Sequence, residues 1–60
     1  MAAKLVASYE EAKKIGGMKA MMRMALITGI PSNKAESEPD SAENIALFEK
    51  ALAEVKKENA

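Results

Sequence analysis

A ten-residue segment at positions 18–27, MKAMMRMALI, constrains this chain more than any other feature. At about 100° per residue, most of its apolar side chains share one side of a helix: Met18, Met21, Met22, Ala25 and Leu26. Met24 and Ile27 lie outside that side, so the helix is apolar over more than one face. Because a single antiparallel neighbour covers only one face, another part of the chain or another chain must cover the rest, and we expect a second chain to do so.

The size of the chain points the same way. Sixty residues form one small domain, in which a hydrophobic core alone gives marginal stability. The sequence has no cysteine and no histidine, which excludes disulfides and the common zinc sites. Association with another chain is the remaining reinforcement for so small a fold. We therefore expect a homo-oligomer, either a dimer or a tetramer.

The last third of the chain is predicted to be an amphipathic helix at about residues 39–57. Its apolar residues recur at spacings of three, four and three: Ile45, Phe48, Leu52 and Val55. Two starts are open, one with Asp40 and Glu43 as a capping-box-like pair, the other with Ser37 as cap and Pro39 just inside the helix.

An earlier helix is predicted at about residues 8–28. Ser8 and Glu11 have the spacing of a capping box at its start, and the residues before them, AAKLVA, leave an earlier start open. Gly29, followed by Ile30 and Pro31, is typical of a Schellman-type end with glycine in the left-handed C′ position. Residues 29–38 then form a polar loop.

The pair Gly16–Gly17 interrupts this first helix. Two glycines in a helix interior cost about 2 kcal/mol relative to alanine. The apolar pattern also changes phase there, because Val6 and Tyr9 fall on the side opposite the methionines. The helix either kinks or splits at this point, or continues and uses the glycines for close approach of a neighbour.

These elements predict an all-α fold, a single helical domain over residues 1–60 arranged as a helical hairpin. Two copies would pack into a homo-oligomeric four-helix bundle. The predicted interaction interface consists of Met18, Met21, Met22, Leu26, Ile45, Phe48, Leu52 and Val55. In that bundle the residues of the first helix would pack against those of the second.

Catalytic and cofactor chemistry has little material here. Without histidine or cysteine, the chain lacks the usual acid–base and nucleophilic groups, so we predict no enzyme, no catalytic residues and no cofactor. Thioethers bind Cu(I), but a methionine stripe without other soft ligands is more typical of packing, and no metal site is predicted. No stretch is long and apolar enough for a signal peptide or a membrane span, so a cytoplasmic protein is expected.

The uneven distribution of charged residues along the chain leaves an alternative function open. Residues 1–30 carry five cations and two acids, whereas residues 31–60 carry four cations and seven acids, and the net charge is zero. We expect a protein–protein interaction module that self-associates as a regulator or adaptor, with a different protein at the methionine face as a further option. A basic strip supports the alternative, a nucleic-acid-binding regulator: Lys13, Lys14, Lys19 and Arg23. A neutral chain disfavours nucleic acid, and the absence of tryptophan disfavours a membrane surface.

Overall fold

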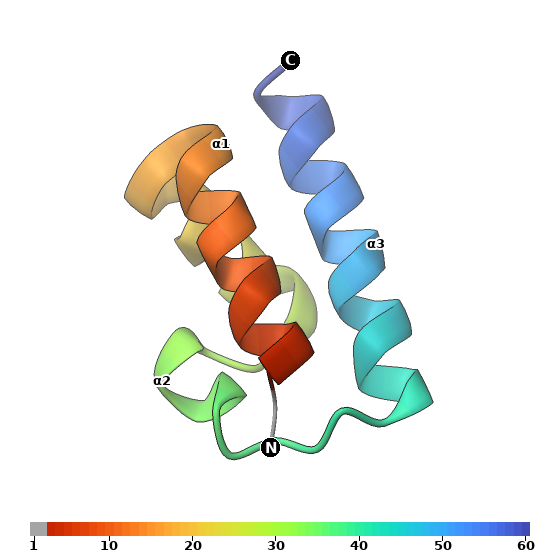
Figure 1. The fold of residues 1–60 in the computed structure, drawn as a ribbon. Coiled ribbons are helices and arrows are strands. Elements are labelled where there is room, and N and C mark those ends of the chain that lie inside the picture. Colours follow the sequence, from red (N-terminus) through yellow and green to blue (C-terminus); the bar gives the residue numbers. More distant parts are fainter. Residues whose placement is uncertain (1–2) are drawn as a thin grey trace.

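Three helices make up the fold, and no strand is present in residues 3–60, the part that the computed structural model describes. The helices are α1 (Ala3–Thr28), α2 (Ser32–Ala35) and α3 (Ala42–Glu58). The two long helices pack against each other, with the short α2 between them in the sequence (Figure 1). The predicted all-α helical hairpin is therefore confirmed. Residues 1–2 of the predicted domain lie outside the described residues.

Helix α1 is broken at Gly17, one of the alternatives that the sequence left open. Gly17 has φ 67° and ψ −148°, far from helical values, in a region that is essentially restricted to glycine. A straight helix of 26 residues would be about 39 Å long, but the longest extent of the molecule is 29 Å. The chain therefore turns back at Gly17 (Figure 1). We call residues 3–16 the first arm and residues 18–28 the second arm.

The first arm begins before Ser8, which is the earlier start that the sequence leaves open. The helix is already formed at Ala3, and Ser8 lies inside it, where its hydroxyl donates to the carbonyl of Lys4 at 3.1 Å. The prediction that Ser8 caps the helix is therefore wrong. Leu5 explains the earlier start, because its side chain is fully buried and gives the first turns an apolar contact.

Gly29 ends α1 as predicted, with φ 73°. Its N–H donates to the carbonyl of Ala25 at 2.8 Å, which is the single hydrogen bond of the αL motif. The N–H of Ile30 is bound instead by the hydroxyl of Thr28, at 3.1 Å. The helix end is thus an αL motif and not the predicted Schellman motif, because a side chain satisfies the second donor.

The predicted polar loop at residues 29–38 contains the short helix α2. Ala35 at the end of α2 is fully buried and joins the core, whereas the three residues before it are exposed. This single buried alanine ties the connection to the rest of the molecule, so the segment is not simply a solvated loop.

Helix α3 begins a few residues later than predicted. Ser41 is its N-cap, and the Ser41 hydroxyl accepts a hydrogen bond from the N–H of Asn44 at 3.1 Å. Neither Asp40 nor Ser37 caps the helix, which corrects both predicted starts. Glu43 lies in the first turn, and two lysines, Lys56 and Lys57, lie in the last, so these charges complement the helix dipole.

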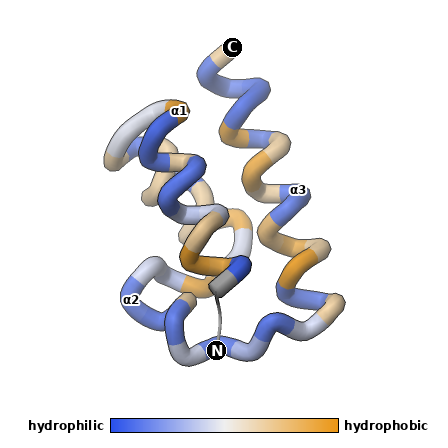
Figure 2. The backbone as a smooth tube through the Cα atoms, viewed as in Figure 1, coloured by the Kyte–Doolittle hydropathy of each residue, from blue (hydrophilic) through white to orange (hydrophobic). Residues whose placement is uncertain are grey.

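One core joins all the helices. It contains Leu5, Tyr9, Ala12, Ala20, Met24, Ala35, Phe48, Ala51 and Val55. The rings of Tyr9 and Phe48 meet edge to face, with centroids 5.6 Å apart and an interplanar angle of 74°. Along α3, apolar residues alternate with hydrophilic ones at helical spacing (Figure 2), and Phe48, Ala51 and Val55 are its buried members. The predicted apolar face of α3 is thereby confirmed, with Ile45 and Leu52 only partly buried.

Candidate interaction surface

Three large apolar side chains of the second arm are exposed to solvent. Met18, Met22 and Leu26 are 72%, 62% and 77% exposed. They follow one another at intervals of four residues, so they form one line along the helix, about 12 Å long. We call these three residues the apolar stripe. It is the clearest feature of the described surface that packing within one chain does not explain.

The opposite side of the second arm faces the core. Ala20 and Met24 are buried there, and Thr28, the next residue at the same spacing, is 8% exposed. The Thr28 hydroxyl donates to the carbonyl of Met24 at 2.8 Å, so this polar group is satisfied inside the helix. The helical periodicity of the sequence puts Met24 outside the side that most of the apolar residues share. In the single chain, Met24 is the methionine that fills the core.

The eight predicted interface residues therefore fall into different environments. Met18, Met22 and Leu26 are exposed, and Met21 is partly buried beside the core. Ile45 and Leu52 are also partly buried, whereas Phe48 and Val55 are almost fully buried within their own chain. The predicted contact of the stripe with Phe48 and Val55 is thus not available to a second copy of this folded chain, because its own helices already cover these two residues.

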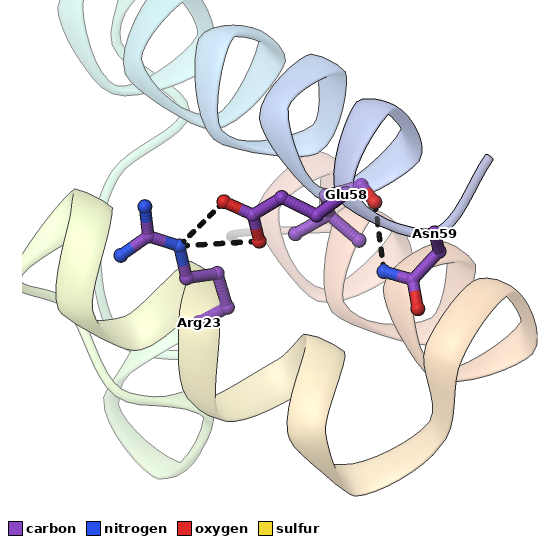
Figure 3. A network of polar contacts seen from close by, with 4 residues as sticks. Arg23, Glu58 and Asn59 are labelled. Carbon is purple, nitrogen blue, oxygen red and sulfur yellow. Dashed lines mark hydrogen bonds and ion pairs between the residues drawn. The ribbon is translucent and has the colours of Figure 1, made fainter.

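The predicted basic strip is exposed, but one of its members is engaged. Arg23 Nε donates to both carboxylate oxygens of Glu58, at 3.2 and 2.9 Å, which joins the second arm to the end of α3 (Figure 3). Both side chains are nearly half exposed, so the pair adds little to stability. It does place an acidic group beside Arg23. The strip is therefore less cationic than its sequence suggests.

Asn59, next to Glu58, lies over Gly16, the residue before the break. Its side-chain amide donates to the carbonyl of Val55 at 2.8 Å (Figure 3). A Cβ added to Gly16 would lie 2.7 Å from the Asn59 side-chain oxygen and 3.0 Å from the Cβ of Ala20. A side chain at position 16 would thus have to displace the Asn59 amide and press on Ala20, whereas at position 17 it is the backbone conformation that favours glycine.

Tyr9 is the titratable group that burial affects most clearly. Burial raises its pKa above the ordinary value of 10.0, and a hydrogen bond with the side chain of Thr28 acts in the opposite direction. Its hydroxyl donates to the carbonyl of Ile30, just after the second arm. This contact holds the first arm against the end of the second, which is a structural role.

The remaining polar groups form no site of evident chemistry. Within residues 3–60, no group of three acidic side chains is placed to hold a metal ion, and no helix is long and apolar enough to cross a membrane. One buried oxygen of Asp40, just before the cap of α3, has no hydrogen-bond partner among the described residues. It stands alone, so it does not define a site.

Comparison of the chain with protein-family models, with curated proteins and with solved structures finds no match. The apolar stripe is therefore the main evidence for the function of this chain.

Proposed function

We propose that this chain is a small helical interaction module that self-associates through the apolar stripe. The observation that carries the proposal is the exposure of Met18, Met22 and Leu26 in one line, on the side of the helix opposite the core. Burying a large aliphatic side chain or methionine yields about 1.5–3 kcal/mol. Three such residues on each of two copies supply a favourable free energy of the same order as the roughly 4–15 kcal/mol that association costs in translational and rotational freedom.

The charges favour a second copy of this chain as the partner that covers the apolar stripe. The chain is neutral overall, so two copies have no net repulsion to overcome. Along the stripe, Lys19 and Arg23 lie on one edge, and Glu58 is held beside Arg23. In a twofold symmetric dimer with antiparallel stripes this edge meets its own counterpart, so Lys19 of one copy lies on the same side of the contact as Glu58 of the other.

Methionine suits such a contact. Its side chain is unbranched and adaptable, so two stripes can interdigitate without a fixed shape. A stripe of this length is short for a standard interface, which buries about 800 Å² on each partner. That area is roughly a fifth of the 4104 Å² accessible surface of the chain. We therefore propose a reversible dimer, suited to a regulator or adaptor and not to an enzyme.

A charge introduced into the stripe tests the proposal. Met22→Glu places a carboxylate at the centre of the contact, and Ala46→Glu makes a comparable change at an exposed position of α3. Sedimentation equilibrium over a concentration series should show a dimer for the wild type and for Ala46→Glu, and a monomer for Met22→Glu. Helicity by circular dichroism should be the same in all three. A wild type that stays monomeric, or a Met22→Glu variant that dimerises as tightly as the wild type, would refute the proposal.

The same proteins test the nucleic-acid alternative. Binding through the basic strip would give an affinity for a short DNA duplex that falls steeply with salt, because phosphate contacts release counterions. It would also weaken when Lys13 and Lys14 are replaced by glutamine, and Met22→Glu would leave the contacts of those lysines intact. We expect no such affinity, because the chain is neutral and Arg23 is already paired with Glu58.

A further inference from the structure

The break in α1 depends on one residue. Residues on both sides of Gly17 are helical, and Gly17 alone has non-helical dihedral angles. Apart from adjacent residues of its own chain, no atom lies within 4 Å of the position where a Gly17 Cβ would be, so this position has room for a side chain. The turn between the arms is therefore a hinge with a single backbone residue.

The contacts across this hinge come from a few defined groups. Tyr9 of the first arm donates to the carbonyl of Ile30 beyond the second arm, and its ring meets Phe48 of α3. Leu5 and Ala12, on the same arm, are fully buried in the common core. A first arm from another copy presents the same groups, so it can make the same contacts.

We propose that the first arm is exchangeable between two copies of this chain. In the exchanged state Gly17 becomes helical, α1 straightens to a single helix of about 39 Å, and each first arm packs into the core of the other copy. The core contacts of one chain are replaced by identical contacts between chains, which makes such an exchange a low-cost route to a dimer. This inference goes beyond the proposed function, because it uses the core-facing side of the first arm and not the apolar stripe.

The dihedral angles of Gly17 supply a matched pair of variants for a chemically synthesised chain. An L-alanine there cannot readily adopt φ 67° and favours the helix, so Gly17→Ala should drive exchange. D-alanine has the same atoms and the opposite preference. Its mirror-image angles, about −67° and +148°, are those of polyproline II, which L-residues adopt freely. D-alanine at position 17 should therefore keep the arms closed.

Distance measurements distinguish the two states. Spin labels on cysteines replacing Lys4 and Ser32, both exposed, report on the two ends of α1. In a straight α1, residue 4 and the helix end at residue 28 are about 36 Å apart, more than the 29 Å extent of the closed chain. All samples carry Met22→Glu, which removes association through the stripe, and doubly labelled chains are diluted with unlabelled ones so that only distances within a chain are measured.

We expect a long distance within the chain and a doubled mass for Gly17→Ala, and a short distance and monomeric mass for the D-alanine chain. A folded Gly17→Ala variant that keeps the short distance would overturn the proposal. If that variant does not fold, chains with glycine at position 17 and a single label at residue 4 or residue 32 are mixed at high concentration and annealed. A short distance between chains, absent when D-alanine is at position 17, then supports exchange, and no such distance overturns it.

Discussion

Two methionines of the second arm, Met22 and Met24, provide a sharp test of which helix face forms the core. They are the same residue type two positions apart, but Met22 is 62% exposed and Met24 is fully buried. Met22→Ala and Met24→Ala therefore make the same chemical change in opposite environments. Each variant is the control for the other, since helix propensity changes equally in both.

The expected effects differ by several-fold. Truncating a buried methionine to alanine costs about 2–5 kcal/mol, because contacts are lost and a cavity remains. A change at an exposed position without special contacts stays within about 0.5 kcal/mol. At about 0.05–0.15 kcal/mol per residue, a chain of 60 residues has a free energy of unfolding of about 3–9 kcal/mol. Met24→Ala thus removes a large part of the total stability.

Urea denaturation followed by helical circular dichroism measures both effects. The protein concentration must be low enough that the wild type is monomeric, because a dimer would also bury Met22. We expect a much lower midpoint for Met24→Ala and a midpoint close to that of the wild type for Met22→Ala. Equal losses, or a larger loss for Met22→Ala, would show that the second arm presents the other face to the core.

Three further changes test the ends and contacts of the helices. The free energy of unfolding of the wild type should fall above pH 10, because Tyr9 has a raised pKa in the folded chain and therefore loses its proton more easily in the unfolded chain. In pH-dependent melts, Tyr9→Phe should lack this part of the fall. Ser41→Ala should cost about 1 kcal/mol in urea denaturation, since the N–H of Asn44 loses its acceptor, and an unchanged midpoint would argue against this cap. Gly29→Val should cost about 1–3 kcal/mol in the same assay, because a β-branched residue is strained at φ 73°; equal stability would mean that position 29 is not left-handed.

The helices of this chain follow from local sequence signals, and the choice of core face in the second arm does not. Gly29 and the apolar spacing of α3 act within a few residues, so their effects are visible in the sequence. The apolar stripe is the more hydrophobic face in the sequence pattern, but it is exposed. Met24 and Ala20, on the other side of the helix, form the face that is buried. Helical periodicity shows which residues share a face and does not show which face meets the rest of the chain.

One signal in the sequence did point to the observed arrangement. Val6 and Tyr9 lie opposite the methionines when the helix is drawn as continuous, and Tyr9 is indeed in the core. The two arms can each turn their buried face inward only because the chain reverses at Gly17. That reversal depends on one pair of dihedral angles. The sequence permits those angles but does not require them, because glycine also tolerates the helix.

The methionine methyl groups are direct probes of self-association through the apolar stripe. Spectra of protein labelled with ¹³C at these methyls, recorded over a dilution series, report on Met18, Met22 and Met24 separately. If the stripe mediates self-association, the Met18 and Met22 signals should shift with concentration while the Met24 signal stays constant. Signals that remain unchanged up to high concentration, or a Met24 signal that shifts as much as the other two, would rule out association through the stripe.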